Sequence, residues 1–195
     1  MHIAHISYVD FYESAFSSRA EYEKLISAVE ATPRDQSKAK LAMHQAARMI
    51  WLADRIDDFA RKRPALQLLF YMIAAEAVAK IVVGFEGEGQ SRKHVRIFFE
   101  DICDAKHKSI LSKAFSKVEA GYLSIEETID LLYIIRCDVV HEGRYFSFSL
   151  PESVNDYPEI TTVGQEAITA HITLNEIRQI VIEGALLGVQ TLLLK

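Results

Sequence analysis

Arg136 and His141 are the two side chains of this sequence whose types and spacing best suit a chemical step. They stand five positions apart near the end of the apolar run LLYIIRCDVVHEG, where a helical pattern would place Leu or Ile. Cleavage of RNA without a metal needs a base for the 2′-OH proton and an acid for the leaving 5′-oxygen, and histidine titrates in the range that suits both. It also needs a fixed positive charge on the phosphoryl oxygens, which a guanidinium supplies. These two residue types are therefore the ones that such a reaction would need, although they also fit a purely structural role.

The spacing of the pair predicts a site that two protomers share. Five residues turn an ideal helix by roughly 140° beyond a full turn, so the two side chains converge poorly unless His141 lies in a loosened last turn. A two-fold axis near this helix lets each Arg136 face the other chain's His141 and supplies one imidazole as acid and one as base. We expect a homodimer that buries at least roughly 1,000 Å² around residues 133–146. The apolar residues available for this contact are Tyr133, Val140, Tyr145 and Phe146.

Further polar side chains are predicted to line the cleft that holds Arg136 and His141. They are Glu76, Tyr133, Asp138, Glu142 and Arg144. A simpler interpretation involves no catalysis: the guanidinium pairs with one of the three carboxylates among them, and the helix dipole favours a histidine near the C-terminus. The two interpretations differ in the surroundings of the guanidinium. An open cleft supports the first, and burial against a carboxylate inside one protomer supports the second.

The segment LLYIIRCDVVHEGR resembles the signature helix of the HEPN domains, a family of small all-helical bundles marked by Arg-x4-6-His. The earlier segment FYMIAAEAVAKIVVG is similar to a core helix of that family, which often carries a glutamate where Glu76 stands. Many members are metal-independent ribonucleases whose active site forms where the motif helices of two protomers meet. The resemblance implies that Arg136 and His141 are the catalytic pair. The family often has a polar residue directly after the arginine, whereas Cys137 occupies that position here and Asp138 follows it.

A local excess of positive charge lies between residues 91 and 117. This stretch holds seven Lys and Arg against three acidic residues, a local net charge of +4 in a chain whose formal net charge is -5. Because the whole chain has no basic field, any RNA contact must rest on a patch of this kind. Arg92, Lys93 and Arg96 are the candidates for binding an RNA backbone. A solvated helix face without a ligand is the alternative.

Helices must position these side chains, because most of the chain has helical periodicity. Two capping boxes, Ser124–Glu127 and Thr173–Glu176, predict where the last two helices begin, and Gly143 is placed to end the first of them. Helices are predicted at about residues 8–31, 36–62, 64–83, 91–119 (one helix or two shorter ones), 124–142 and 173–194. In the second of these, Leu41, Leu52 and Phe59 are among the apolar side chains expected to point inward.

The predicted fold is an all-α bundle of five or six helices, HEPN-like, in one domain over residues 1–195. A small β insertion is expected at about 145–172, before the last helix, because short runs of β-branched and aromatic residues alternate there with Pro and Asn-Asp turns. Tyr145, Phe146 and Phe148 alternate as they would on a strand, and they suit core packing, a dimer edge or the stacking of bases.

Composition indicates a cytoplasmic protein. Cys103 and Cys137 lack the spacing of a metal site and indicate reduced thiols. The first residues lack the basic and apolar regions of a secretory signal. The run LQLLFYMIAAEAVAKIVVG is interrupted by Glu76 and Lys80, so it predicts a buried helix and no membrane association. No cofactor or metal is expected.

Three functions remain open from the sequence. The first is a HEPN-like endoribonuclease that acts without a metal as a toxin or phage-defence effector, for which a nucleotidyltransferase-type antitoxin would be the partner. The second is a non-catalytic HEPN-like module that binds RNA or nucleotide or serves dimerisation. The third is a plain interaction protein in which the spacing of Arg136 and His141 is coincidental.

Overall fold

Seven α-helices and one small antiparallel sheet make up most of the described chain. The computed structural model describes residues 11–33, 37–117, 120–163 and 166–194, and the chain is mostly helical, with 64% helix. The helices are α2 (Arg19–Ala31), α3 (Lys38–Ile56), α4 (Pro64–Val83), α5 (Ser91–Ile97), α6 (Ala105–Leu111), α7 (Ile125–Glu142) and α8 (Leu174–Leu193), with a short 3-10 turn η1 (Glu13–Ala15) before them. The strands are β1 (Phe115–Lys117), β2 (Gly121–Tyr122), β3 (Glu159–Val163) and β4 (Glu166–Ala170). The start of the first predicted helix, residues 8–10, lies outside the described residues.

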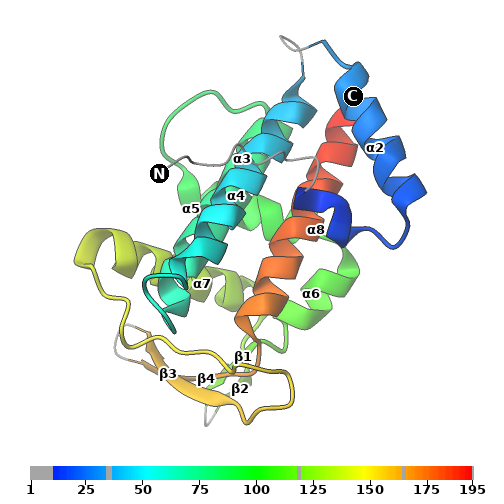
Figure 1. Cartoon of the computed structure of the whole chain (residues 1–195). Coiled ribbons are helices and arrows are strands. Elements are labelled where there is room, and N and C mark those ends of the chain that lie inside the picture. The colour runs from blue at the N-terminus through cyan, green and yellow to red at the C-terminus, as the bar shows by residue number, and fades with distance from the viewer. Residues whose placement is uncertain (1–10, 34–36, 118–119, 164–165, 195) are drawn as a thin grey trace.

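Helix α4 is the centre of the bundle, and α3, α7 and α8 pack around it (Figure 1). Its buried side includes Ala74, Ala75 and Ala79, whose small side chains let neighbouring helices approach closely. Pro64 stands in its first turn and Gly84, with φ 69°, ends it, as predicted. By length and composition α4 is the one described helix that could cross a membrane. In this fold it is the core helix, surrounded by other helices.

The sheet combines two strands that precede α7 in the sequence with two that follow it, and it lies across one end of the bundle (Figure 1). Its order is β2-β1-β4-β3 and every pairing is antiparallel. Strands β3 and β4 confirm the prediction of a small β region before the last helix. The helix predicted through residue 119 is wrong at its end, because β1 pairs with β4 there, Ser116 lying opposite Thr169. That partner is distant in the sequence and leaves no local signal.

The stretch between α5 and α6 is a π-helical turn, η2 (Phe98–Ile102), so the predicted fourth helix is divided. Phe98 and Phe99 are fully buried and pack edge to face, with ring centroids 5.0 Å apart. Phe98 lies against Gly184 of α8, where an added Cβ would stand 2.6 Å from its Cζ atom. The glycine therefore lets α8 approach η2 closely.

Two further predictions are wrong. Leu41, Leu52 and Phe59 were expected to point inward but are 48%, 38% and 79% exposed. Leu41 and Leu52 lie within α3, whose core face is formed by other residues such as Met43 and Ile50, and Phe59 lies beyond the end of α3 at Ile56, in the turn of residues 57–63. Residues 145–148 are not a strand: Phe148 is buried, whereas Phe146 is 67% exposed.

Candidate functional site

Helix α7 carries the predicted pair, and both of its ends are fixed by the sequence. The side chains of Ser124 and Glu127 cap the start reciprocally, as predicted. Gly143 adopts the left-handed conformation, φ 63°, that a residue without a Cβ adopts easily, and its N–H and that of Arg144 both donate to the carbonyl oxygen of Asp138. The helix is regular through Glu142, so His141 does not lie in a loosened turn.

Arg136 is half-buried and keeps its guanidinium free of carboxylates. Its Cζ atom lies 5.7 Å from the centre of the Tyr133 ring, a cation–π contact within one turn of the helix. Among the described residues it forms no ion pair and no side-chain hydrogen bond. The interpretation in which a carboxylate of the same protomer neutralises Arg136 therefore finds no support in the described part of the chain.

Glu76 has a structural role that involves α5. Its carboxylate pairs with Lys80 at 2.7 Å, one turn along α4, and accepts a hydrogen bond of 2.8 Å from the hydroxyl of Ser91 at the start of α5. It also lies near Tyr133: burial, a hydrogen bond with Cys137 and the negative charge of Glu76 together raise the pKa of that phenol, against the opposing charge of Arg136. Glu76 therefore belongs to the surroundings of Arg136 without binding it.

His141 is exposed and lies on the other flank of α7. No hydrogen bond or ion pair joins its ring to another described residue. Asp138, one turn before it, is held loosely by Arg144, with 3.5 Å between Oδ1 and Nη2, and Glu142 is exposed. On a regular helix Arg136 and His141 therefore stay about 140° apart, so one protomer alone does not bring them together.

The outward stripe of α7 lies between these two side chains. Tyr133, Cys137 and Val140 follow one another at spacings of four and three residues, which places them on one face of a helix. The buried residues of α7, among them Thr128, Leu132 and Ile135, lie on another side of the helix, although Tyr133 is itself partly buried against the core. Val140 is 48% exposed although it is apolar. Arg136 and His141 thus flank an outward, partly apolar stripe.

The predicted RNA-binding arginines are committed to another role. The carboxylate of Asp130 on α7 accepts hydrogen bonds from Arg92 Nε at 2.9 Å and from Arg96 Nε at 3.1 Å, and each guanidinium adds a second bond. These bonds hold the pKa of Asp130 at about 2. Lys93 donates to the side-chain oxygen of Gln90 at 3.2 Å. The two arginines therefore tie α5 to α7, and only their remaining N–H groups are left for a ligand.

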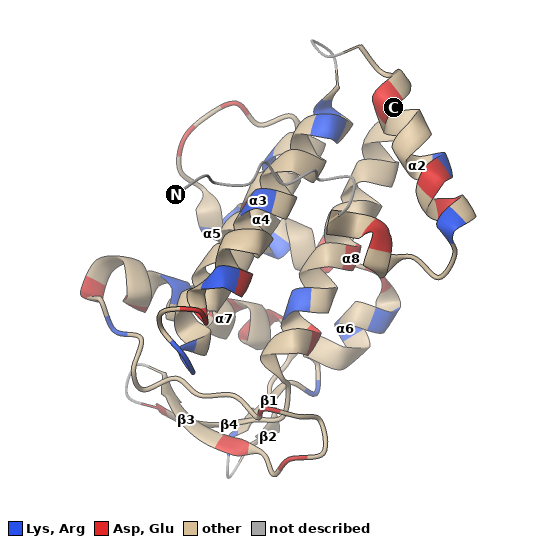
Figure 2. Ribbon diagram, in the orientation of Figure 1, with Lys and Arg blue, Asp and Glu red and all other residues tan. Residues whose placement is uncertain are grey.

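Two of the three positive charges on α5 are thus paired with the carboxylate of Asp130. Figure 2 shows Lys and Arg interspersed with Asp and Glu along the helices. Arg92, Lys93 and Arg96 border an open hollow of about 580 Å³ together with Gln90, Ile97 and Glu100. This open surface is poorly suited to binding RNA, because two of its arginines are already paired with Asp130.

A cleft of mixed polarity lies at the ends of α3, α4 and α8, and its lining does not include Arg136 or His141. It has a volume of about 670 Å³, and Asp54, Tyr71 and Arg178 are among the residues that line it. Arg178 Nε and Nη2 each donate to Asp54 at 2.8 Å, and the Tyr71 hydroxyl donates to Asp54 at 3.3 Å. Burial and the charge of Asp54 raise the pKa of Tyr71. No local pattern of residues predicts this cluster, because its members come from three helices that are distant in the sequence.

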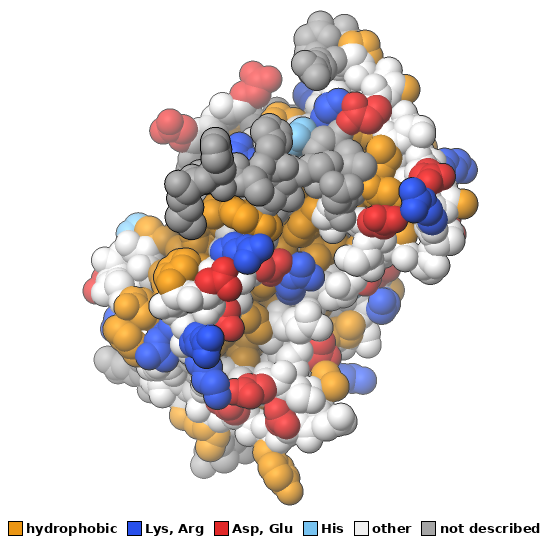
Figure 3. All heavy atoms as spheres, viewed as in Figure 1, with side chains coloured by type: hydrophobic (Ala, Val, Ile, Leu, Met, Phe, Trp, Pro, Cys, Tyr) orange, Lys and Arg blue, Asp and Glu red, His pale blue; other side chains and the backbone are white. Residues whose placement is uncertain are grey.

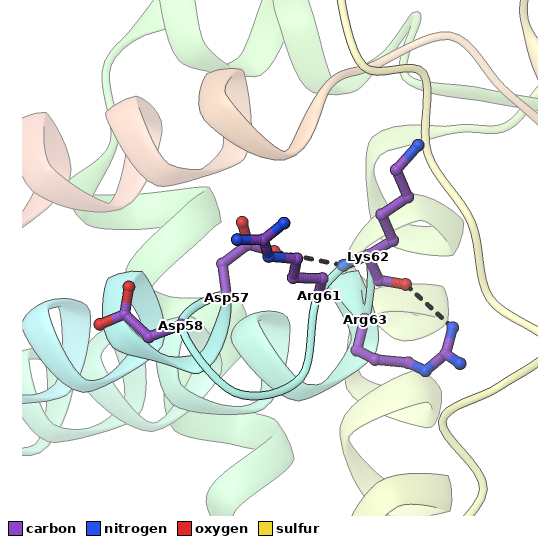
Figure 4. Close-up of a pocket in the computed structure, with 5 residues that line it drawn as sticks. All are labelled: Asp57, Asp58, Arg61, Lys62 and Arg63. Carbon is purple, nitrogen blue, oxygen red and sulfur yellow. Dashed lines mark hydrogen bonds between the residues drawn. The ribbon is translucent and has the colours of Figure 1, made fainter.

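A second hollow, of about 600 Å³, is formed by the turn between α3 and α4 (Figure 4). It is lined by Asp57, Asp58, Arg61, Lys62 and Arg63. The run DDFARKR, with an aromatic residue inside a charged turn just before Pro64, was the available signal for it. Neither Arg136 nor His141 lines any of these four hollows, so the cleft predicted around the two side chains stays a prediction.

The described residues include no group of three or more His, Cys, Asp and Glu side chains arranged to hold a metal ion. No protein-family model, no curated protein and no solved structure matches the chain.

Proposed function

We propose that the protein is a HEPN-like endoribonuclease that cleaves RNA without a metal and is active as a homodimer. The observation that carries the proposal is the arrangement on α7: neither Arg136 nor His141 forms an ion pair or a side-chain hydrogen bond with a described residue, and the two flank the outward stripe of Tyr133, Cys137 and Val140. A charged side chain held at a surface without a counter-ion is available to a ligand.

Pairing of α7 with its copy would complete the site. When two parallel helices pack along a stripe with spacings of four and three, the residues on either side of the stripe face the flanking residues of the partner. In that arrangement Arg136 lies opposite the partner's His141, because a residue on one flank meets the residue five positions later on the other flank. The spacing that separates the two side chains within one chain thus brings them together between two chains.

The chemistry of such a site follows from the residue types. One imidazole takes the proton from the 2′-OH, and the 2′-oxygen then forms a bond to phosphorus. The bond from phosphorus to the 5′-oxygen breaks, and the second imidazole, protonated, gives its proton to that oxygen. The two guanidinium groups stabilise the negative charge that builds on the phosphoryl oxygens. The products are a 2′,3′-cyclic phosphate and a free 5′-hydroxyl.

The proposed setting is the cytoplasm, where RNA is accessible. There the protein would act as a toxin or a phage-defence effector, with a nucleotidyltransferase-type antitoxin as the partner that restrains it. Asp138, Glu142 and Arg144 border His141 at the end of α7, and Glu76 lies behind Tyr133. In the proposal these side chains adjust the site and do not take part in the chemical step.

Cleavage of a mixed-sequence RNA in the presence of EDTA tests the proposal. We expect cleavage by the unaltered chain, a bell-shaped dependence of rate on pH, and loss of at least about 100-fold in rate in Arg136→Ala and in His141→Ala. Arg19→Ala, which changes an exposed arginine on α2, is the matched control. Absence of any cleavage product, with the protein folded and dimeric, would refute catalysis.

Subunit mixing tests whether the site is shared. If both histidines are needed, an equal mixture of unaltered and His141→Ala chains, left to exchange subunits, retains about a quarter of the original activity, because only about a quarter of random dimers carry two intact chains. A self-contained site in each protomer would retain about half. The two values are readily distinguished.

A second function, a non-catalytic module that binds RNA or nucleotide, is favoured by one observation. The arginines nearest α7, Arg92 and Arg96, are paired with Asp130, and the formal net charge of the chain is -5. Both features weaken the attraction of a polyanionic substrate. Dimerisation without cleavage, in the experiment above, is the result that this function predicts.

A further inference from the structure

The turn between α3 and α4 presents an aromatic ring and a basic run to solvent. Phe59 is 79% exposed, and Arg61 and Lys62 are exposed as well. Lys62 has a left-handed backbone, φ 57°, and its N–H donates to Asp57 Oδ1 at 3.2 Å (Figure 4). Glycine or asparagine suits this conformation better than lysine. The turn therefore carries its basic side chain at a cost in backbone strain.

The turn between α3 and α4 contacts the segment that follows α7. Arg63 stacks over the ring of Phe146, with 5.2 Å from Cζ to the ring centre, and Lys62 pairs with Glu152 at 2.6 Å. Phe146 is 67% exposed and stacks on Tyr145, their ring centres being 4.0 Å apart. Phe146 follows His141 by only five residues, so its Cα atom lies within about 18 Å of the Cα atom of the proposed catalytic histidine.

Two acidic residues of this region are already paired, while Asp57 accepts the backbone N–H of Lys62 and forms no ion pair with a described residue. Asp58 pairs with Arg55 at 3.2 Å, and Glu152 is taken by Lys62. Arg61 has no ion pair with a described residue, and Arg63 donates only to the backbone oxygen of Lys62. Two guanidinium groups therefore form no ion pair with a described residue: Arg63 lies against the ring of Phe146, and Arg61 follows Phe59 by two residues. Figure 3 shows hydrophobic side chains next to Lys and Arg on the side of the molecule where α3 ends.

We propose that this surface, made by Phe59, Arg61, Arg63 and Phe146, binds single-stranded RNA and leads it to the end of α7. Unpaired bases stack on the two phenyl rings, and the guanidinium groups contact phosphates and the faces of bases. The proposal rests on the proposed function, since it gives the substrate of that site its binding surface. It assigns RNA contact to the α3–α4 turn in place of the paired arginines of α5.

The chemistry of the surface favours a nucleic acid over a second protein chain. The central part of a protein–protein interface is depleted in charge and joins apolar side chains into a continuous patch. Here Arg63 covers part of the ring of Phe146, and Phe59 precedes Arg61 by two residues in the same exposed turn. Alternation of rings and cations is the pattern that follows a single strand.

Binding of a fluorescent oligoribonucleotide without secondary structure, followed by anisotropy in the His141→Ala background, tests the proposal. We expect Phe59→Ala and Arg61→Ala each to weaken binding at least about fivefold, and Phe59→Trp to retain it, since stacking of one base contributes about that much or more. The salt dependence should flatten in Arg61→Ala. Tyr122→Ala is the matched control, because Tyr122 is 58% exposed on β2, at the opposite edge of the sheet from β3.

The outcomes separate this proposal from the proposed function. Weaker binding in both variants, with the control unchanged, supports the surface even if the unaltered chain cleaves no RNA. Unchanged binding in both variants overturns it even if cleavage occurs. A change of oligomeric state in Phe59→Ala, measured by light scattering, would identify the surface as a protein contact and also overturn it, as would failure of the His141→Ala protein to bind RNA. A duplex of the same sequence should bind more weakly than the single strand.

Discussion

Arg178 and Asp54 stand 124 residues apart in the sequence and form a two-pronged ion pair, Nε and Nη2 of the guanidinium each lying 2.8 Å from a carboxylate oxygen. The pair joins α8 to α3, and the hydroxyl of Tyr71 on α4 donates to the same carboxylate. Both side chains are about one-third exposed, so water screens the pair only in part. It therefore locks together the three helices that form the cleft.

Arg178→Met should lower the free energy of unfolding by about 2 kcal/mol, because it leaves the carboxylate of Asp54 half-buried and unpaired. In a domain of this size that corresponds to a fall of roughly 4 to 8 °C in Tm. Thermal unfolding followed by circular dichroism measures it. Arg55→Met is the matched control: Arg55 pairs with Asp58 on the open surface, and its loss should cost less than about 1 kcal/mol. Equal effects of the two substitutions would contradict the role given to the Arg178 pair.

Gly184→Ala should destabilise the protein although alanine is the better helix former. Helix propensity alone favours alanine by about 1 kcal/mol. The new Cβ, however, would stand 2.6 Å from Phe98 Cζ and 2.8 Å from Cys103 Sγ, in a fully packed core. Overpacking of that kind costs about 1 to 3 kcal/mol, so we expect a net loss in urea unfolding. The control is Gln190→Ala, at an exposed position of the same helix, which should change the free energy of unfolding very little. If Gly184→Ala proved more stable than the unaltered chain, η2 would have moved to make room for the added Cβ atom, and the packing argument would be wrong.

Local signals explain which elements the sequence could predict. The boxes at Ser124 and Thr173 act within three residues, and Gly143 acts on the turn before it, so the ends of α7 and the start of α8 follow from the sequence alone. The position of Arg136 and His141 on one helix follows in the same way. Because each residue of an α-helix adds the same rotation, the angle between the two side chains around the helix axis is then fixed, whatever surrounds them.

Elements that depend on distant partners could not be predicted. Strand β1 exists because β4, more than fifty residues later, supplies its hydrogen bonds. Arg92 and Arg96 look like free cations in the sequence, and only the packing of α5 on α7 brings Asp130 between them. Phe59 was expected inside because the helical period runs through it, whereas the chain leaves the helix at Ile56. Each difference arises from tertiary contacts that override a local pattern.

The carboxylate of Asp130 makes the free energy of unfolding depend on pH in the acid range. Hydrogen bonds from Arg92 and Arg96 lower the pKa of Asp130 from 3.8 to about 2 in the folded chain, the bond from Arg92 having the larger effect. Burial of the carboxylate acts in the opposite direction but is outweighed. A group whose pKa is lower when folded binds protons more readily when unfolded, so its contribution is complete above pH 4 and is lost as the pH falls from about 4 to 2.

Asp130→Asn should therefore cost about 1 kcal/mol of unfolding free energy at pH 7, a value reduced by the exposure of the guanidinium groups. The difference between the two proteins should be the same at pH 7 and pH 5 and should shrink by pH 2.5. Urea unfolding at the three pH values measures it. A difference that stays constant down to pH 2.5 would mean that the substitution acts through packing and not through charge.

Cys137 offers a direct report on the proposed dimer, because it lies in the middle of the outward stripe of α7. In a parallel pair of helices that meet along this stripe, Cys137 faces the partner's Cys137, with Cα atoms at a distance that a disulfide can span. Mild oxidation with diamide should therefore give a covalent dimer on a non-reducing gel, and reductant should reverse it. Cys103 is an inert internal reference, since burial raises the pKa of its thiol to about 12.

Cys137→Ser should abolish the cross-link, whereas Cys103→Ser should leave it intact. The covalent dimer should retain ribonuclease activity, because the disulfide holds Arg136 opposite the partner's His141 as the proposed site requires. Val140→Asp, which places a charge on the same stripe, should prevent both dimerisation and cross-linking while leaving the circular dichroism spectrum unchanged, since Val140 is 48% exposed in one protomer. If light scattering finds a dimer that diamide does not cross-link, the two α7 helices do not meet along this stripe, and the shared arrangement of Arg136 and His141 is wrong.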